Sequence, residues 1–404
     1  MRDAFIVEGA RSAFGNFTGT LSPIRTDDLL AHVLKGLIDK IPGFNPELLD
    51  DVIMGCANQA GEDNRNVARM GSLLAGIPWS VPGETVNRLC ASGMSSVIHA
   101  RRAIAVDEGD LFLAGGVEHM TRGPWVISKV SKAFGRDAQM YDSSFGWRFI
   151  NPKMKELYGV DGMGNTAENL AELYSISRED QDAFAYWSQQ KAAKAQSNGR
   201  FKEEIVPIHI PVRKSDPIVF ENDEFIKAST SLEVLAKLRT AFKKKENGGT
   251  VTAGNASGLN DGAAAVLVAS ECAINTHGLK PLARIVSSAV VGVEPRIMGI
   301  GPVGASKLAL KRAGLSLDDM GLIELNEAFA AQSLACTRNL GLEDNDPRIN
   351  PNGGAIAIGH PLGASGARIL HTAALELHKQ NQRYALVTMC VGVGQGYATI
   401  IEKA

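Results

Sequence analysis

The second part of the chain repeats the order of elements found in the first part. Residues 28–114 contain an amphipathic helical period, an apolar strand, a helix that opens with Cys90-Ala91-Ser92-Gly93, and another apolar strand. Residues 306–389 follow the same order, with Gly363-Ala364-Ser365-Gly366 in the place of the cysteine segment. An internal repeat indicates two similar structural units. We therefore expect an α/β fold with a pseudo-twofold core, in which strand ends and helix starts from both units meet at an interface.

Local patterns predict the individual elements. Helical periods predict helices at residues 28–38, 66–75, 166–174, 178–196 and 306–313. Apolar runs predict strands at residues 1–8, 51–56, 111–116, 322–325 and 386–389. The strand at 111–116 is expected to end at its two glycines, Gly115 and Gly116. Residues 254–262 predict a turn-rich loop before the apolar segment 263–269.

The texture of the sequence changes between the two units. From about Thr121 to Gly249 the chain holds three of its four tryptophans, scattered prolines and the run Lys243-Lys244-Lys245. A chain of 404 residues is also too long for one ordinary core. We expect a first half made of residues 1–120 with 250–270, an inserted loop domain at 121–249, and a second half at 271–404. The lysine run is either a solvated face or a contact for ligand phosphates.

Composition excludes several classes of function. A net charge of −2 gives no general basic surface, so nucleic acid is not expected as a partner. No apolar run approaches bilayer length, and the N-terminus resembles a strand more than a signal peptide, so we expect a cytoplasmic protein without membrane contact. Five widely spaced cysteines argue against a disulfide framework or a Cys-x-x-Cys site, and the histidines lack metal-ligand spacing. No bound metal is expected.

Cys90 stands between a polar run and an apolar helical period. Free N–H groups and the dipole at a helix start favour the thiolate, which is the form that attacks a carbonyl carbon. A lone cysteine is more often a small buried core residue. Its assignment therefore depends on what partners the rest of the chain supplies.

Those partners come from three stretches of the second half, around Asn326, His360 and Cys390. His360 lies among small residues ahead of a helix start, where it could take the proton of Cys90. Cys390 ends an apolar strand and could move protons on the substrate. Asn326 and the backbone N–H groups of Cys90 and Gly392 are candidates for oxyanion stabilisation. This set indicates acyl transfer through a thioester on cysteine. The glycine-rich loop that ends at Gly396 does not fit a dinucleotide site, because too few residues follow it.

These motifs, in this order along the whole chain, resemble the thiolases. The four segments are the Cys90 block, Asn326-Glu327-Ala328-Phe329, Gly359-His360-Pro361 with residues 363–366, and Cys390-Val391-Gly392. The resemblance implies two βαβαβαββ halves stacked in five layers (αβαβα) with a loop domain inserted in the first. It also implies a homotetramer, a dimer of dimers.

The resemblance further implies a ping-pong reaction. Cys90 would take the acyl group from a 3-oxoacyl-CoA and release acetyl-CoA, and free CoA would then remove the acyl group. His360 would activate Cys90, and Cys390 would act as acid and base at the substrate α-carbon. Asn326 would hold a water that forms one oxyanion hole with His360, while the N–H groups of Cys90 and Gly392 form the other.

Coenzyme A is expected as a co-substrate, with no permanently bound cofactor. Family members line its site at positions that correspond here to Met163, Phe242, Ala253, Ser257, Met298, Ala328 and Phe329. Lys227 stands near the nucleotide end, where members often have arginine, and Val234 stands where serine is common. Gly162 replaces a histidine that is common in acetoacetyl-CoA-specific members.

Within the family, residues 55–69 and 146–152 are most similar to the 3-oxoadipyl-CoA thiolase branch of aromatic degradation. The far end of such a substrate is a carboxylate, with which Arg65, Arg69 or Arg148 could pair. The same arginines could instead form structural contacts. Gly164-Asn165 differs from the Pro-Glu of close branch members.

Three other functions compete with this branch assignment. An acetyl-CoA acetyltransferase acting on acetoacetyl-CoA, or a general 3-ketoacyl-CoA thiolase, would use the same residues. A ketoacyl synthase of similar fold is disfavoured by Cys390, where a second histidine is normal. A non-enzymatic acyl-CoA binder would leave the catalytic set unexplained.

Overall fold

The first half is built on a mixed sheet. The computed structural model describes residues 2–404, and Met1 lies outside them. The sheet has the order β4-β3-β5-β10-β1, with β3, β4 and β5 parallel and β10 antiparallel to both β5 and β1. Its strands are β1 (Ala4–Arg11), β3 (Asp51–Gly55), β4 (Gly83–Val86), β5 (Leu111–His119) and β10 (Asn260–Ser270), and β2 (Gly15–Asn16) pairs with β10.

The second half repeats this arrangement. Its strands have the order β12-β13-β14-β11, with β12 and β13 parallel and β14 antiparallel to both of its neighbours. They are β11 (Ala283–Gly292), β12 (Met320–Leu325), β13 (Tyr384–Val391) and β14 (Gln395–Lys403). Residues Phe5 and Ile6 of β1 pair with Arg284 and Ala283 of β11, which joins the two sheets edge to edge. The internal repeat predicted from the sequence is confirmed.

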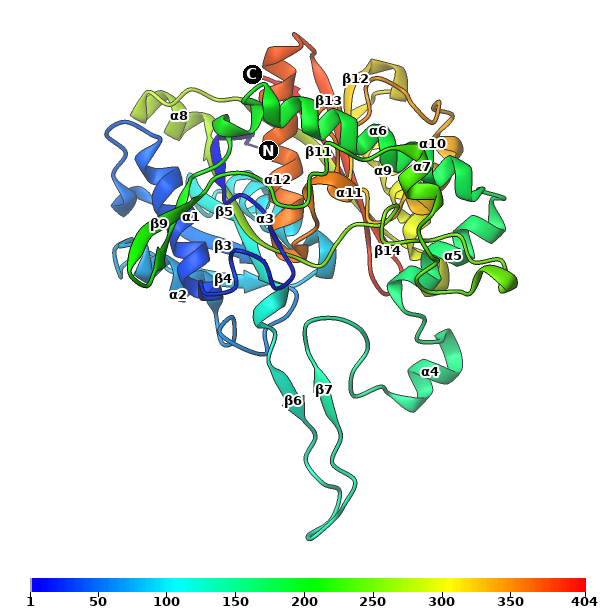
Figure 1. Ribbon diagram of the computed structural model, residues 1–404. Helices are drawn as coiled ribbons and strands as arrows, with labels where there is room; N and C mark the ends of the chain where they lie inside the picture. Colours follow the sequence, from blue (N-terminus) through cyan, green and yellow to red (C-terminus); the bar gives the residue numbers. More distant parts are fainter. Residues whose placement is uncertain (1) are drawn as a thin grey trace.

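Helices form three layers around the two sheets (Figure 1). In the middle, α3 (Ser92–Ala105) packs directly on α12 (Leu362–Lys379), and each helix also contacts sheet strands. On the outside, α1 (Thr26–Asp39) and α2 (Val67–Leu74) cover the first half, and α9 (Gly301–Ala313) packs on β11, β13 and β14. This is the expected αβαβα stack.

The two central helices touch through glycines. A Cβ atom on Gly93 of α3 would lie 2.5 Å from the carbonyl oxygen of Gly363, at the start of α12. A Cβ on Gly366 would lie 2.3 Å from the backbone nitrogen of Met94. Neither position has room for a side chain, so the glycines of the two similar segments are required by the close approach of the helix starts.

The predicted helices and strands are found, but two boundaries were wrong. β5 does not end at Gly115 and Gly116; it continues to His119 and is buried along its whole length. Gly115 faces β10 so closely that a Cβ would lie 2.1 Å from the carbonyl oxygen of Ala264. The glycines therefore serve close backbone packing inside the strand, not its end. Similarly, β10 already begins at Asn260, inside the segment that was predicted as loop.

The region between the halves carries smaller elements. Strands β6 (Trp125–Ile127) and β7 (Met140–Asp142) form an arm that projects away from the body of the molecule (Figure 1). The other elements there are α4 (Pro152–Tyr158), α5 (Met163–Leu173), α6 (Arg178–Ser197), β8 (Ile208–Val212), β9 (Ser215–Phe220) and α7 (Leu232–Ala236). We propose the bounds 1–120 with 250–270, 121–249 and 271–404 for the three parts.

The remaining helices are short, except for α10. They are α8 (Glu271–His277), α10 (Ala330–Leu340) and α11 (Ala355–Ile358), with 3₁₀ segments at η1 (Pro46–Leu48), η2 (Leu89–Ala91), η3 (Met120–Arg122), η4 (Arg200–Glu203), η5 (Lys245–Asn247), η6 (Pro295–Ile300) and η7 (Leu317–Asp319). Within residues 2–404, none of the helices combines the length and the apolar character needed to cross a bilayer.

Candidate active site

The candidate catalytic residues lie where the two halves meet. Cys90 lies in η2, between β4 and α3 of the first half. Asn326 follows β12, His360 precedes α12, and Cys390 lies near the end of β13, all in the second half. η2 contacts both α12 and β13, which brings the first-half cysteine against the second-half residues. The predicted convergence of strand ends and helix starts at the interface is confirmed.

His360 is held in one orientation by three hydrogen bonds. Its backbone N–H donates to Asn260 Oδ1 at 2.9 Å, and its ring nitrogen Nδ1 lies 2.7 Å from Ser365 Oγ. The Ser365 hydroxyl donates its single proton to the carbonyl of Pro361 at 2.8 Å, so it accepts from His360 Nδ1–H. Nε2 is then the unprotonated nitrogen, and Asn326 Nδ2 donates to it at 3.4 Å. Nε2 is therefore the atom that can accept a proton.

The imidazole is neutral at ordinary pH. Burial, with the positive charge of Arg368 as a second cause, lowers the pKa of His360 to about 4. Arg368 lies on α12 and forms an ion pair of 3.8 Å with Glu324 of β12. A base with this pKa keeps Nε2 free throughout the neutral range.

Cys90 is a neutral thiol in the resting protein. Burial raises its pKa to about 11, although N–H groups of Gly392 and of Cys90 itself favour the thiolate. The expected position at the start of a helix is correct, but the expected thiolate is not, because loss of water outweighs the backbone N–H groups. The proton of Cys90 must therefore leave as the thiol attacks, which calls for a nearby base.

Cys390 is fully buried, and burial followed by the proximity of Cys90 raises the pKa of its thiol. Gly392 follows in the turn between β13 and β14, and a Cβ there would lie 3.2 Å from Leu89 Cδ1 and 3.7 Å from the sulfur of Met163. Gly392 is buried against Leu89 and Met163, and its backbone N–H favours the thiolate of Cys90, which places this N–H beside the nucleophile. Asn326 Oδ1 is buried without a protein partner among residues 2–404.

Most of the residues expected at the coenzyme A site cluster together. The loop with Ser257 pairs with the loop before α10, since Ser257 N–H donates to the carbonyl of Ala328 at 3.0 Å. Phe242 packs edge-on against Phe329 with ring centres 6.1 Å apart. Buried Met298 of η6 belongs to the same apolar cluster as Ala328 and Phe329, and α5, which begins at Met163, packs on η6. Ala253 is exposed in the turn before this cluster.

A basic cavity of about 460 Å³ adjoins Phe242. Its lining includes residues 236–246 and Arg178, with the run Lys243-Lys244-Lys245. Lys227 is not among these lining residues; its side chain is exposed and its ammonium lies 5.3 Å from the ring of Phe225. The lysine run supplies the positive charge here together with Arg178, Lys237 and Arg239, and Lys227 does not.

Gly164, a departure from close branch members, has a structural reason. A Cβ on Gly164 would lie 2.2 Å from the ring of Phe242. The glycine therefore leaves the space that this ring fills.

Similarity to known proteins agrees with this geometry. Residues 4–272 match the model of the thiolase N-terminal domain, and residues 279–403 match the thiolase C-terminal domain. The chain belongs to the thiolase family. Over its full length it is 57% identical to a beta-ketoadipyl-CoA thiolase of Acinetobacter baylyi, over 100% of both chains. It is 56% identical, again over 100% of both, to a 3-oxoadipyl-CoA/3-oxo-5,6-dehydrosuberyl-CoA thiolase of Escherichia coli.

Solved structures are similar throughout. The crystal structure of an acetyl-CoA acetyltransferase of Bacillus anthracis matches with a TM-score of 0.92 and 39% identity, over 100% of this chain and 99% of that one. Human mitochondrial 3-ketoacyl-CoA thiolase matches with a TM-score of 0.90 and 42% identity, over 100% and 99%. The chain is therefore an acyltransferase of the thiolase family.

Sequence reasoning missed a buried carboxylate of this thiolase. Glu118, at the end of β5, accepts N–H groups from Ala57 (3.0 Å), Asn58 (2.9 Å) and Gly363 (2.9 Å), and so ties a first-half loop to the start of α12. Burial raises its pKa to about 7. The only sequence signal was a glutamate, next to His119, directly after an apolar run. The sequence predicted that this strand ends at Gly116, before Glu118.

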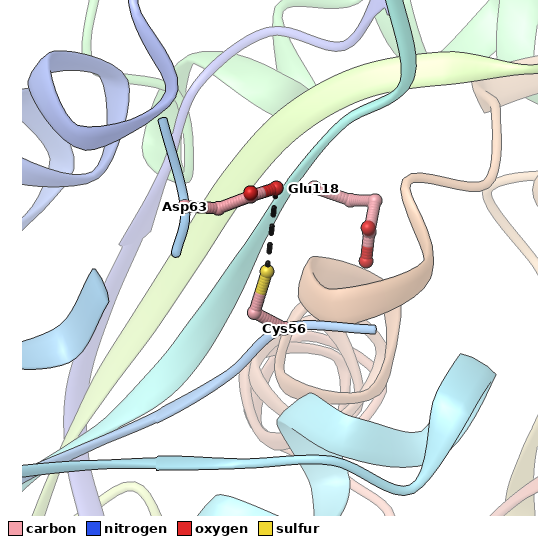
Figure 2. Close-up of side chains that lie close together, drawn as sticks. All are labelled: Cys56, Asp63 and Glu118. Atoms are coloured by element: carbon pink, nitrogen blue, oxygen red, sulfur yellow. Dashed lines mark hydrogen bonds between the residues drawn. The ribbon is translucent and has the colours of Figure 1, made fainter. Parts of the chain in front are cut away.

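Cys56 and Asp63 lie beside Glu118 (Figure 2). Their ligand-capable atoms lie within 4.8 Å of one another. However, three backbone N–H groups already occupy the Glu118 oxygens, and the Cys56 thiol donates to the carbonyl of Asn58 at 3.0 Å. Burial raises the pKa of Cys56 well above its usual value, which disfavours the thiolate that a metal needs. The three side chains anchor the loop 56–63.

Proposed function

We propose that this thiolase cleaves 3-oxoadipyl-CoA with coenzyme A to succinyl-CoA and acetyl-CoA, or catalyses the reverse condensation. The observation that supports this substrate is full-length identity of 56–57% to thiolases named for it. The residues around Cys90 support the chemistry, because a nucleophile, a base with a free nitrogen and a second thiol lie at one interface. The expected site in the cell is the cytoplasm.

In the first half-reaction, Cys90 is the nucleophile and His360 its base. As Sγ forms a bond to C3 of the substrate, the thiol proton moves to His360 Nε2, the nitrogen that Ser365 leaves unprotonated. The oxyanion at C3 accepts N–H groups of Cys90 and Gly392, one of two oxyanion holes that we propose. The C2–C3 bond then breaks, and its electron pair takes a proton from Cys390 at C2, which releases acetyl-CoA.

In the second half-reaction, coenzyme A removes the acyl group. The Cys390 thiolate takes the proton of the CoA thiol, whose sulfur attacks the acyl-cysteine carbonyl. The bond to Cys90 breaks, and its sulfur recovers the proton from His360. The second oxyanion hole acts earlier, in the first half-reaction: Asn326, with a water on its unpartnered oxygen and with His360, would hold the thioester oxygen of the acetyl-CoA unit as the C2–C3 bond breaks.

For coenzyme A, we propose the cluster Met163, Phe242, Ala253, Ser257, Met298, Ala328 and Phe329 as the wall along the pantetheine. The basic cavity beside Phe242 suits the phosphates of the nucleotide, because its three consecutive lysines can neutralise them. Lys227 is exposed and lies outside the lining of this cavity, so it would contact only the outer part of coenzyme A.

We also propose a homotetramer, assembled through the arm of β6 and β7. Large apolar side chains are exposed along and beside this arm, including Trp125, Ile127, Phe134 and Met140. An apolar arm that projects into water is typical of a surface that another subunit covers. Sedimentation velocity of the full chain measures the assembly directly. A monomer at micromolar concentration would contradict it.

The test of the substrate is a comparison of kcat/KM for CoA-dependent thiolysis of 3-oxoadipyl-CoA and acetoacetyl-CoA. A preference of about a hundredfold for the dicarboxylic substrate, about 2.7 kcal/mol, supports the proposal. Equal rates, or a preference for acetoacetyl-CoA, would leave the thiolase chemistry in place and favour an acetyl-CoA acetyltransferase.

A further inference from the structure

Arg148 is a half-buried arginine in the segment that returns from the arm to the body. Its guanidinium donates to Asn58 Oδ1 at 3.2 Å and to the carbonyl of Ser143 at 3.3 Å. Both acceptors are neutral, and they use two of the five N–H donors of the side chain. No carboxylate among residues 2–404 forms an ion pair with it. The group therefore keeps the charge and the donors for an anion.

On one side, Arg148 is connected to the loop beside the nucleophile. Its partner Asn58 follows Ala57, whose carbonyl accepts from the side-chain amide of Asn87 at 3.0 Å. Asn87 Oδ1 in turn accepts the N–H of Leu89 at 2.9 Å, and Leu89 directly precedes Cys90. Two hydrogen bonds thus connect the Ala57–Asn58 loop to the residue before Cys90.

On the other side, the neighbouring Trp147 is fastened near the second wall of the site. Its indole N–H donates to the carbonyl of Asp161 at 3.2 Å, just before α5 begins at Met163. The sulfur of Met163 faces Gly392, at 3.7 Å from the position of a Cβ there. The segment that carries Arg148 is therefore held between the Cys90 loop and the Met163–Gly392 contact.

The two other candidate arginines lie elsewhere. Arg69 donates to the carbonyls of Val81 and Trp79, in the turn that precedes β4, whereas Cys90 follows the opposite end of that strand. Arg65 is exposed, at a left-handed backbone position with φ of 63°, and its side chain makes no hydrogen bond to the described part of the chain. Neither shares the connections of Arg148 to the site.

We propose that Arg148 binds the terminal carboxylate of a dicarboxylic acyl chain and so determines substrate preference. The inference rests on the proposed function. In 3-oxoadipyl-CoA, only three carbon–carbon bonds separate the carbonyl carbon that Cys90 attacks from the carboxylate carbon. The carboxylate must therefore be met by a residue held close to the Cys90 loop, as Arg148 is. A planar guanidinium with free donors can bind it through two parallel hydrogen bonds.

The experiment measures kcat/KM for both substrates in the wild type and in Arg148→Met, with Arg65→Met as the matched control. Loss of a charge-assisted contact should lower the value for 3-oxoadipyl-CoA roughly thirtyfold or more. The value for acetoacetyl-CoA, which has no second carboxylate, should change less than about threefold; it also shows that the variant is folded. Arg148→Lys keeps the positive charge but not the planar guanidinium. Its kcat/KM for 3-oxoadipyl-CoA should lie between those of the wild type and Arg148→Met. Arg65→Met should change neither value.

The outcomes separate this inference from the proposed function. If the wild type prefers 3-oxoadipyl-CoA and Arg148→Met keeps that preference, Arg148 does not bind the carboxylate and the substrate proposal stands. An equal loss on both substrates would show a structural role and would also overturn the inference. A wild type without the preference would refute the proposed substrate and this role together.

Discussion

Removal of the Ser365 hydroxyl should impair catalysis without a change in any residue that touches substrate. Among residues 2–404, this oxygen is the one hydrogen-bond partner of His360 Nδ1, at 2.7 Å, and both groups are buried. Ser365→Ala would leave the Nδ1–H without an acceptor and would free the ring to shift its proton to Nε2. Leaving a buried donor unpaired costs about 1–3 kcal/mol. If that cost falls on the reactive tautomer, kcat/KM should fall roughly 5- to 150-fold.

Steady-state thiolysis of acetoacetyl-CoA between pH 6 and 9 measures this effect. Alkylation of Cys90 by iodoacetamide, which reports on the same base, should slow in parallel. Ser365→Thr retains a hydroxyl and is the matched variant, expected to recover much of the activity. The reasoning would be refuted if Ser365→Ala had activity within about twofold of the wild type at an unchanged melting temperature. Equal losses in the Ala and Thr variants would point to packing instead of hydrogen bonding.

Four further predictions concern other residues. Cys90→Ser should abolish thiolysis, because a hydroxyl is a far weaker nucleophile, and mass spectrometry should find no acyl adduct; near-normal turnover would contradict the mechanism. Because the pKa of native His360 is about 4, His360 stays unprotonated down to about pH 5, and kcat/KM should not fall on its account above that pH. An acid limb of kcat/KM with a midpoint near pH 6.5 would contradict this. The same lowering means that the unfolded state binds more protons between pH 4 and 6.5, so about 3 kcal/mol of stability should be lost as pH falls through that window, measurable by urea denaturation. Gly93→Ala should destabilise by about 1–3 kcal/mol, because its Cβ would lie 2.5 Å from the Gly363 carbonyl oxygen; an unchanged urea midpoint would argue against the tight helix contact.

Much of the fold follows from local pattern. The helices α1, α6 and α9 and the strands β3, β12 and β13 each follow a periodicity that their sequences show directly. The repeat then gave the arrangement of the halves, because two copies of one order of elements have one efficient way to pack their apolar faces. The interface location of Cys90 and His360 followed from their place at the helix starts of the two copies.

What pattern could not give were contacts between distant residues and the effect of burial. Glycines inside β5 look like strand breakers until the closeness of β10 is known. The pKa of Cys90 depends on how much water reaches the thiol, which no helix-start argument can supply. Glu118 accepts a hydrogen bond from a distant segment, and Ser365 forms one across a turn with His360. Local pattern marks Glu118 at most as a glutamate after an apolar run, and it predicts neither contact.

The placement of the catalytic groups on opposite copies of the repeat has a consequence for synthesis in the cell. The first copy leaves the ribosome with the cysteine but without the base, the amide of Asn326 or the second thiol, which all come from the last part of the chain. A nascent chain therefore has the nucleophile without the base that the folded site provides. Catalysed acyl transfer begins only once α12 docks on α3, so completion of the fold is itself the step that creates the active enzyme.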